Sequence, residues 1–237
     1  MNGRVHSFQS FGAADGPGIR CVVFLSGCPL RCGCCHNPDT WDLSGGEEAS
    51  AEEIFARLLR FREYFGETGG VTVSGGEPLM QSDFCAGLFS LCRAAGINTC
   101  LDTSGCILDD GVKRLLTLCD LVLLDVKYTS NEDYLRYVGC SYWQVLDFYR
   151  YLVTSGVPMW LRQVVLPSLN DDDENYRRLA RLRDEGCGLV RRVELLPFRK
   201  LCTVKYASLG IDFPFRDIPE PSPALLERAN AILSERL

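Results

Sequence analysis

The amino-acid sequence predicts an α/β fold in which βα units follow one another and the strands form a parallel sheet. Short apolar runs alternate with segments of helical periodicity six times along the 237 residues. Hydrophobic residues make up 46% and charged residues 24% of the chain, the balance of a globular protein with one sizeable core. No apolar run approaches the roughly 20 residues that a membrane-spanning helix requires.

The first half of the chain is expected to contain four strands and three helices. Residues 21–25 form a β-branched and aromatic run, which is typical of a buried strand. Ser50 and Glu53 form the capping box that opens a helix, and Gly96 is typical of a helix end. The strands are expected at 19–25, 71–74, 98–102 and 121–125, and the helices at 50–65, 83–95 and 110–118.

The second half continues the alternation. Asp171 and Glu174 are expected to form another capping box, and Ser222 precedes Pro223 in the order that opens a helix. Strands are expected at 159–166 and 190–196, and helices at 131–155 (broken near Gly139), 171–185 and 222–237. No segment is typical of a linker, so residues 1–237 are expected to form a single domain, with 198–237 as a C-terminal loop and helix extension.

Polar and glycine-rich segments stand where the predicted strands end. They are Ser26-Gly27-Cys28, Ser74-Gly75-Gly76-Glu77, Asp102-Thr103-Ser104-Gly105 and Asp125-Val126-Lys127, and Arg162 lies within a further strand. The carboxyl ends of parallel strands meet at one edge of a sheet, where α/β proteins place their chemistry. These segments are therefore expected to converge on one rim.

Charge and cysteine usage limit the function classes. The net charge of −6 argues against general binding to nucleic acids or anionic membranes. The 13 cysteines are an odd number, and residues 1–12 have no secretory signal, so we expect a cytoplasmic protein whose grouped cysteines serve metal or redox chemistry. The scattered cysteines in apolar surroundings are expected to be buried thiols: Cys85, Cys92, Cys100 and Cys119.

Four cysteines lie within eight residues, in Cys28-Pro-Leu-Arg-Cys32-Gly-Cys34-Cys35. A structural zinc site would need a second pair of ligands a dozen or more residues away, and none is present. The spacing Cys28-x3-Cys32-x2-Cys35 favours a four-iron cluster that leaves one iron open to bind a substrate. Zinc binding and a chance group of buried cysteines remain alternatives from the residues alone.

The cysteine spacing resembles that of the radical S-adenosylmethionine (radical SAM) enzymes, and the chain resembles the pyruvate formate-lyase activating enzymes among them from about residue 3 to the C-terminal helix. The motifs that carry this resemblance are Arg4-Val-His-Ser-Phe, Asp15-Gly-Pro-Gly-Ile-Arg20, Cys35-His-Asn-Pro-Asp-Thr-Trp-Asp42, Ser74-Gly-Gly-Glu-Pro78, Thr99-Cys-Leu-Asp-Thr-Ser-Gly105, Leu121-Val-Leu-Leu-Asp-Val-Lys127, Asn170-Asp-Asp-Asp and Glu194-Leu-Leu-Pro-Phe198. The resemblance implies a partial (β/α)6 barrel, which agrees with the six expected βα units.

The resemblance also implies an activity. Cys28, Cys32 and Cys35 would hold a [4Fe-4S] cluster whose fourth iron binds S-adenosyl-L-methionine. Reductive cleavage of this cofactor would give a 5′-deoxyadenosyl radical, which takes a hydrogen atom from a glycine of a partner enzyme. The implied partner is a glycyl radical enzyme of the pyruvate formate-lyase type, and the implied electron donor is flavodoxin or ferredoxin.

Further site residues follow from the same resemblance. Gly75, Gly76 and Glu77 would contact the amino group of the cofactor, although the same residues also suit a tight turn. A monovalent cation would lie beside Asp102, Thr103 and Asp125, because two carboxylates at one rim otherwise repel each other.

Two basic residues are expected to be catalytic. Lys127 would lie near the cofactor, with a solvated surface charge as its alternative. Arg162, inside an apolar strand, would face a carboxylate. Asn37 would order the cluster loop or bind the partner's peptide.

The chain departs from the family pattern at three places. Cys34 replaces an aromatic residue and is expected not to bind iron, because a fourth thiolate would close the open iron. Phe198-Arg199 stands where Tyr-His is usual, so Arg199 is a candidate to replace a cofactor-binding histidine. Leu201-Cys202 replaces Leu-Gly. These departures concern local cofactor contacts rather than the type of reaction.

Three functions remain open at this point. The first is the activase, and no cysteine lies between Cys35 and Ser74, where relatives with other partners insert extra clusters. The second is a radical SAM enzyme that activates another glycyl radical enzyme or acts on a small molecule. The third is a non-enzymatic metal-binding or redox-sensing protein.

Overall fold

The computed structural model describes residues 1–235 and divides into two compact units, Met1–Pro29 with Thr40–Leu123 and Leu30–Asp39 with Leu124–Leu237. The expected end of the last helix at Leu237 lies outside the described residues. None of the helices within residues 1–235 is long and apolar enough to cross a membrane.

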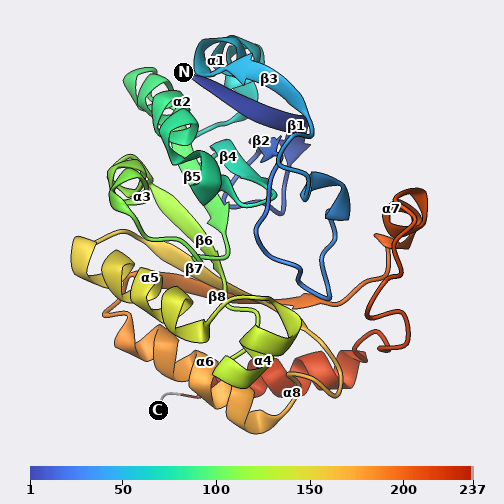
Figure 1. Ribbon diagram of the computed structural model, residues 1–237. Coiled ribbons are helices and arrows are strands. Elements are labelled where there is room, and N and C mark those ends of the chain that lie inside the picture. Colours follow the sequence, from blue (N-terminus) through green and yellow to red (C-terminus); the bar gives the residue numbers. More distant parts are fainter. Residues whose placement is uncertain (236–237) are drawn as a thin grey trace. The chain divides into compact units, whose positions relative to one another are not determined.

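The first unit contains most of the expected βα units. Its elements are β1 (Asn2–Gly12), β2 (Arg20–Leu25), β3 (Glu47–Ser50), α1 (Ala51–Leu59), β4 (Gly70–Gly75), α2 (Ser82–Ala94), β5 (Asn98–Thr103) and α3 (Asp110–Leu116). Strands β2, β4 and β5 are parallel neighbours, as predicted, and α1, α2 and α3 succeed one another along this sheet (Figure 1). Strand β6 (Leu121–Asp125) leads into the second unit.

Two antiparallel strands of this unit were not predicted. β1 pairs with β2 on one side and with β3 on the other. The sequence of β1 has no apolar run and no strict alternation of polar and apolar residues, because it includes Gly3, His6, Ser7 and Gln9. It forms because β2 and β3 both supply backbone partners, so the tertiary context outweighs its weak strand propensity.

The helices of the first unit begin largely where the sequence predicts. The capping box of Ser50 and Glu53 is present at the start of α1, which ends at Leu59, earlier than expected, and a short 3-10 turn follows at Arg62–Tyr64. The core includes apolar side chains of β2, β4, β5 and the helices α1, α2 and α3. The predicted burial of Cys85, Cys92, Cys100 and Cys119 is confirmed, with 0–7% of each residue exposed.

Arg20 lies at the opening of β2 and is fully buried. Its guanidinium donates to Thr72 Oγ1 and Val71 O at 2.7 Å and to Asn98 Oδ1 at 2.9 Å. A planar cation with several donors can join three strands in this way. Arg20 therefore joins β2, β4 and β5 at their amino ends, opposite the carboxyl ends where the candidate site residues lie.

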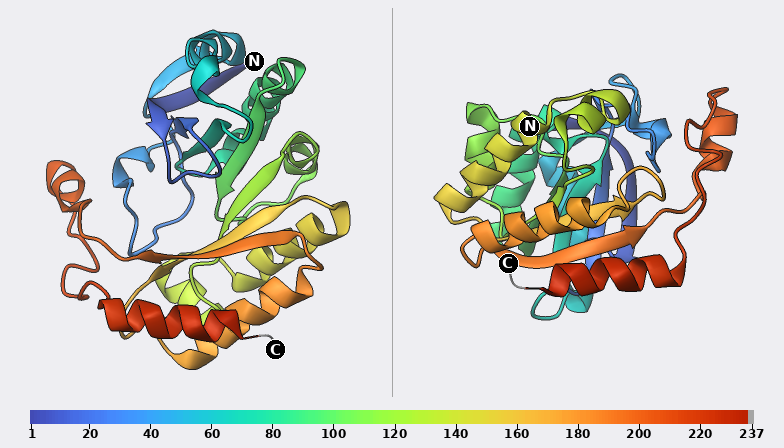
Figure 2. Two further views of the ribbon diagram at one scale, coloured as in Figure 1. Left: turned by 180° about the vertical axis from the view of Figure 1, so that it is seen from behind. Right: turned by 90° about the horizontal axis from the view of Figure 1, so that it is seen from below.

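The second unit contains a parallel pair of strands and the remaining helices. Its elements are α4 (Asn131–Tyr137), α5 (Tyr142–Ser155), β7 (Met159–Val165), α6 (Asp173–Glu185), β8 (Val190–Pro197), α7 (Thr203–Ser208) and α8 (Pro223–Ser234). β7 and β8 are parallel, and α6 and α8 lie side by side against β8 (Figure 2). Tyr176 of α6 and Ala229 and Ile232 of α8 form a buried cluster between these helices.

The structure tests three expectations for this unit. The break near Gly139 is confirmed, because α4 and α5 are separate helices. The capping box of Asp171 and Glu174 is wrong: Asp172 caps α6, and its side chain accepts from the backbone N–H of Asn175 at 2.9 Å. The segment 198–221 is not all loop, because it contains α7.

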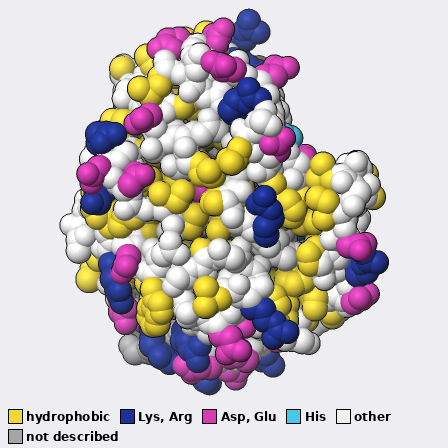
Figure 3. Space-filling model, viewed as in Figure 1, with side chains coloured by type: hydrophobic (Ala, Val, Ile, Leu, Met, Phe, Trp, Pro, Cys, Tyr) yellow, Lys and Arg dark blue, Asp and Glu magenta, His cyan; other side chains and the backbone are white. Residues whose placement is uncertain are grey.

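Charged side chains of both signs are interspersed on the surface. The face shown in Figure 3 has no continuous patch of lysine and arginine, and basic side chains lie next to acidic ones. This distribution agrees with the net charge of −6 and gives no footprint for a polyanion on that face.

Candidate active site

In the first unit, the loops after three parallel strands are joined by hydrogen bonds. The N–H of Gly76 donates to Leu25 O, and the N–H of Glu77 donates to Gly27 O, both at 2.8 Å. Ser74 Oγ donates to Asp102 Oδ2 at 2.7 Å. The segments that follow β2, β4 and β5 therefore converge, as the sequence predicts for the carboxyl ends of parallel strands.

The two glycines of this rim are required by close backbone approach. Gly75 has φ +114°, and a Cβ on it would lie 2.3 Å from Leu25 N. A Cβ on Gly76 would lie 2.2 Å from Gly27 O and 3.0 Å from Thr40 O. Any side chain at either position would push these backbones apart. The glycines thus set the tight packing of the rim.

Glu77 is 1% exposed and acts as a clamp on the next loop. Its Oε1 accepts from Thr103 Oγ1 at 2.5 Å and from the N–H of Leu79 at 3.1 Å. Its Oε2 accepts from the N–H and the hydroxyl of Ser104 at 3.0 and 2.5 Å. Burial raises the pKa of Glu77 above its ordinary value, although these hydrogen bonds oppose the shift. Glu77 therefore orients Thr103 and the backbone that follows it.

In the second unit, Asp125 and Lys127 form an ion pair with an Nζ–Oδ2 distance of 2.9 Å and side chains that are 31% and 18% exposed. Burial alone would raise the pKa of Asp125, but Lys127 and Arg162 outweigh it, and the pKa lies below its ordinary value. Burial alone would lower the pKa of Lys127, but Asp125 outweighs it and holds the pKa well above its ordinary value. Both groups are charged at neutral pH.

Arg162 faces a carboxylate, as the sequence predicts. Its Nε lies 3.5 Å from Glu194 Oε2, and both side chains are largely buried, at 11% and 17% exposed. The N–H of Val126 donates to the carbonyl of Arg162 at 2.8 Å, so the loop that carries Lys127 is anchored beside Arg162. Glu194, the partner on β8, was named in the sequence only as part of a motif.

A buried amide network positions the Lys127 loop. Asn170 donates to the carbonyls of Lys127 and Val164, at 3.1 and 2.9 Å. Gln163 donates to the carbonyl of Val126 at 3.0 Å and accepts from Asn175 at 2.8 Å. These amides satisfy backbone groups that would otherwise be buried without partners. The motif that begins at Asn170 therefore helps to position the Lys127 loop, although the two are far apart in the sequence.

The cysteine loop belongs to both units. Cys28 lies in the first, where its N–H donates to Trp41 O, and Cys32 and Cys35 lie in the second, where the N–H of Cys35 donates to Cys32 O at 3.0 Å. Cys28 and Cys35 are partly exposed and Cys32 is 8% exposed. In residues 1–235 no three His, Cys, Asp or Glu side chains are already gathered as a metal site.

The donors nevertheless suit an iron–sulfur cluster, because three thiols follow one another on one short loop. The turn between the second and third is tightly packed: a Cβ on Gly33 would lie 2.4 Å from the ring of Phe215. Cys34 is 7% exposed, and burial raises its pKa to about 11, so it is a protonated thiol at neutral pH.

Asn37 and Arg199 are engaged by other side chains of the second unit. Lys205 of α7 donates to Asn37 Oδ1 at 2.8 Å and to Asp39 Oδ1 at 3.0 Å. Arg199 forms an ion pair with Glu220, and its carbonyl accepts from His36 Nε2 at 2.9 Å. Sequence reasoning missed Lys205, since it lies 168 residues from Asn37 and has no local signal.

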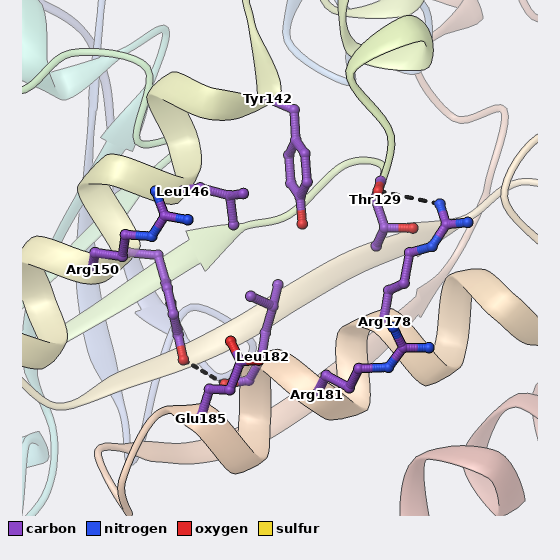
Figure 4. A pocket seen from close by; sticks show the side chains of 9 residues that line it. Thr129, Tyr142, Leu146, Arg150, Arg178, Arg181, Leu182 and Glu185 are labelled. Atoms are coloured by element: carbon purple, nitrogen blue, oxygen red, sulfur yellow. Dashed lines mark hydrogen bonds between the residues drawn. The ribbon is translucent and has the colours of Figure 1, made fainter. Parts of the chain in front are cut away.

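A separate cavity of about 200 Å³ lies between α5 and α6, and none of the expected site residues lines it. Figure 4 shows Arg150, Arg178 and Arg181 around it, with the hydroxyl of Tyr142 directed inward. Arg178 and Arg181 both pair with Glu174, and Arg150 pairs with Asp147. Each of the three arginines therefore has a carboxylate partner, although two of them share Glu174, and Glu185 adds a carboxylate to the lining of the cavity.

Comparison with known proteins places the chain in a family. The model of the radical SAM superfamily matches residues 22–180. The chain is 42% identical to the pyruvate formate-lyase-activating enzyme of Clostridium pasteurianum over 99% of this chain and 98% of that enzyme. It is 39% identical to the pyruvate formate-lyase 1-activating enzyme of Escherichia coli K12, over 98% and 96% of the two chains.

Solved structures show the same fold at low sequence identity. A domain of a pyruvate-formate lyase-activating enzyme from Bacteroides vulgatus has a TM-score of 0.57 at 22% identity, over 70% of this chain and 93% of that one. Streptococcus suis SuiB bound to S-adenosylmethionine has a TM-score of 0.67 at 17% identity, over 87% and 44%. The predicted radical SAM α/β fold is confirmed, and the chain belongs to the radical SAM superfamily and, within it, to the family of the pyruvate formate-lyase-activating enzymes.

Proposed function

We propose that this chain activates a glycyl radical enzyme of the pyruvate formate-lyase type. The observation that carries the proposal is the match to activating enzymes at about 40% identity over nearly the whole of both chains. The family uses a [4Fe-4S] cluster and S-adenosyl-L-methionine, which when bound supply a 5′-deoxyadenosyl radical that removes a hydrogen atom from a glycine of the partner. The protein's own contribution is to bind, orient and shield.

We assign the cluster to Cys28, Cys32 and Cys35. The spacing of these three thiols supports the assignment, and Cys34 stands outside that spacing. The tight turn at Gly33 fixes the backbone between the second and third cysteines.

The rim of the first unit would take the amino acid end of the cofactor. Gly75 and Gly76 are partly exposed, so their backbone is open to a ligand on one side, while the other side packs against Leu25 and Gly27. Glu77 acts as a positioning residue, because all four of its hydrogen bonds go to this protein's own groups. It holds Thr103 in place, and together with Gly75 and Gly76 it forms the segment that we propose to contact the amino group of the cofactor.

The charged set of the second unit would act on the substrate side. Lys127 and Arg162 are cations held in place by Asp125 and Glu194, and they offer donors to carboxylate or carbonyl groups. Asn37 and Arg199 would act near the cluster loop.

We also propose that Asp102, Thr103 and Asp125 hold a monovalent cation. Carboxylate and hydroxyl oxygens are suitable ligands for such a cation. The cation must share the carboxylate of Asp125 with Lys127. Release of 5′-deoxyadenosine in potassium buffer should therefore exceed that in tetramethylammonium buffer, and equal rates would contradict the cation.

Flavodoxin or ferredoxin is the proposed electron donor. The two units are proposed to act as one activating-enzyme domain, since the relatives align with nearly the whole chain and residues 198–237 form its C-terminal extension.

The test is anaerobic reconstitution with iron and sulfide, followed by incubation with reductant, S-adenosylmethionine and the pyruvate formate-lyase of Clostridium pasteurianum or Escherichia coli. We expect a glycyl radical signal in electron paramagnetic resonance and 5′-deoxyadenosine in equal amount. Release of 5′-deoxyadenosine without a protein radical on either partner would favour a small-molecule substrate. The absence of both 5′-deoxyadenosine and a protein radical would contradict the proposal.

A further inference from the structure

The segment 199–215, which contains α7, has several exposed apolar side chains. Leu201 is 82% exposed and Val204 is 76% exposed, the two highest values among the exposed large hydrophobic side chains of the described chain. Further along the same segment, Leu209 and Ile211 are 44% and 42% exposed. We call these four residues the α7 surface. Large exposed apolar groups that gather in one place mark an interaction site.

The opposite side of the same segment is firmly packed. Cys202 and Tyr206 are 2% and 1% exposed, and the ring of Tyr206 lies 4.9 Å from that of Phe213. Leu201 lies in the turn before α7 and Val204 in its first turn, and both are directed away from the buried side chains of Cys202 and Tyr206. The apolar exposure is thus not a sign of a loose segment: one face is anchored and the other is displayed.

This segment is tied directly to the cluster turn. Phe215 presses on Gly33, where a Cβ would lie 2.4 Å from its ring. Lys205, within α7, binds Asn37 and Asp39, two and four residues after Cys35. His36 donates to the carbonyl of Arg199 at 2.9 Å. The α7 surface and the Cys32–Cys35 turn therefore belong to one packed part of the second unit. Within the second unit, α7 stands apart from the paired helices α6 and α8 (Figure 2).

We propose that the α7 surface is a docking site for the protein substrate and binds an apolar patch on the glycyl radical enzyme, outside the segment that carries the target glycine. The proposal rests on the proposed function, which requires a folded protein, rather than a small molecule, at the cluster loop. The continuity of α7 with that loop, through Lys205 and Phe215, favours the protein substrate over a second copy of this chain or a lipid surface. A short peptide that carries only the target glycine does not reach the α7 surface.

The test compares protein and peptide substrates with the reconstituted full chain. The variant is Leu201→Gln with Val204→Gln, and both side chains are exposed enough for folding to tolerate the change. The matched control is Leu135→Gln on α4, because Leu135 is also an apolar side chain of the second unit and is 59% exposed. None of the three residues belongs to the proposed catalytic or cofactor-binding set: Leu201 is the usual leucine of its Leu-Gly pair, and the departure there is Cys202.

We expect the double variant to raise the KM for pyruvate formate-lyase about tenfold, as loss of an apolar anchor at an interface does. Its KM for a peptide of the glycine segment, its iron content and its release of 5′-deoxyadenosine without a protein substrate should stay at the wild-type values. The Leu135→Gln control should match the wild type in every measurement.

The outcomes separate the docking proposal from the function on which it rests. An unchanged KM for the protein overturns the docking site, while the wild-type radical signal still supports the activase. An equal rise in KM for the peptide also overturns it, because the effect then lies at the glycine segment. If the wild type dimerises and the double variant is monomeric with an unchanged KM, the surface binds a second copy. A wild type that makes no protein radical overturns both proposals.

Discussion

In the first unit the buried carboxylate of Glu77 accepts hydrogen bonds from uncharged hydroxyl and backbone donors, whereas in the second unit the carboxylate of Asp125 faces Lys127 and Arg162. The two acids consequently have pKa shifts of opposite sign: that of Glu77 is raised by burial, and that of Asp125 is lowered because the two cations outweigh burial. The neutral donors hold the loop of Thr103 and Ser104 in one conformation. The opposite charges around Asp125 create an electrostatic potential that a charged ligand would alter.

This contrast suggests a division of tasks. The rim of the first unit is rigid, because its glycines and Glu77 are held by backbone groups at short range. The charged set of the second unit is balanced by Asp125 and Glu194. Changes in the first unit should therefore reduce stability through geometry, and changes in the second should act through charge.

The largest effect is expected for Gly76→Ala. Its Cβ would lie 2.2 Å from Gly27 O, and neither backbone can move freely, so the free energy of unfolding should fall by about 3 kcal/mol. The control is Gly87→Ala in α2, where the new Cβ meets Ala51 Cβ at 3.6 Å and should stabilise the helix by up to about 1 kcal/mol. Urea unfolding under anaerobic conditions measures both, and equal stability of the two variants would contradict the tight rim.

Glu77→Gln should cost about 2 kcal/mol. Each carboxylate oxygen accepts from a backbone N–H, of Leu79 or of Ser104, so the amide of Gln must point its NH2 group at one of these donors. Urea unfolding again gives the free energy. A variant as stable as the wild type would show that the Glu77 clamp is not needed for folding.

Asp125→Asn should cost on the order of 1–2 kcal/mol, between the values for exposed and fully buried ion pairs, because both side chains are partly exposed. It leaves Lys127 beside Arg162 without the carboxylate that both cations face. The double variant Asp125→Asn with Lys127→Met removes both charges and should recover part of the loss. Lys127→Met alone completes the comparison. If the loss of unfolding free energy in the double variant equals the sum of the losses in the two single variants, the two charges act independently.

The smallest effect is a dependence on pH. Because the folded-state pKa of Glu77 lies above 4.5, its stabilising contribution is complete below about pH 4.5 and is lost as the pH rises through that raised pKa. The stability difference between the wild type and Glu77→Gln should therefore shrink as the pH rises above 4.5.

Asp125 provides the control for this measurement. Its folded-state pKa lies below 3.8, so its contribution is complete above about pH 3.8 and is lost only as the pH falls through the lowered pKa. The difference between the wild type and Asp125→Asn should be constant from pH 5 to 8. Parallel slopes for both variants would contradict the opposite shifts.

The sequence was most informative where chemistry and chain order coincide. Ser74 and Asp102 could be placed together because parallel strands bring their carboxyl ends to one edge. The pairing of Arg162 with a carboxylate followed from its position in an apolar strand, since a buried cation needs a partner. These inferences use local patterns and one topological rule.

Contacts between distant segments could not be predicted in this way. Lys205 binds Asn37 across 168 residues, and a lysine in a short helix carries no signal of its partner in the sequence. The role of Glu77 as a clamp depends on Ser104, which the sequence marks only as part of a polar loop. β1 was missed because its strand is specified by its neighbours rather than by its own composition.

The central claim is that Cys28, Cys32 and Cys35, and not Cys34, bind the cluster that the reaction needs. The most direct measurement is iron content and release of 5′-deoxyadenosine after anaerobic reconstitution of Cys34→Ser and of Cys32→Ala. Both residues are largely buried, at 7% and 8% exposed, so the pair is matched for burial. The account predicts wild-type iron and cofactor cleavage in Cys34→Ser and loss of both in Cys32→Ala. Loss of the cluster in Cys34→Ser, or a full cluster in Cys32→Ala, would contradict it.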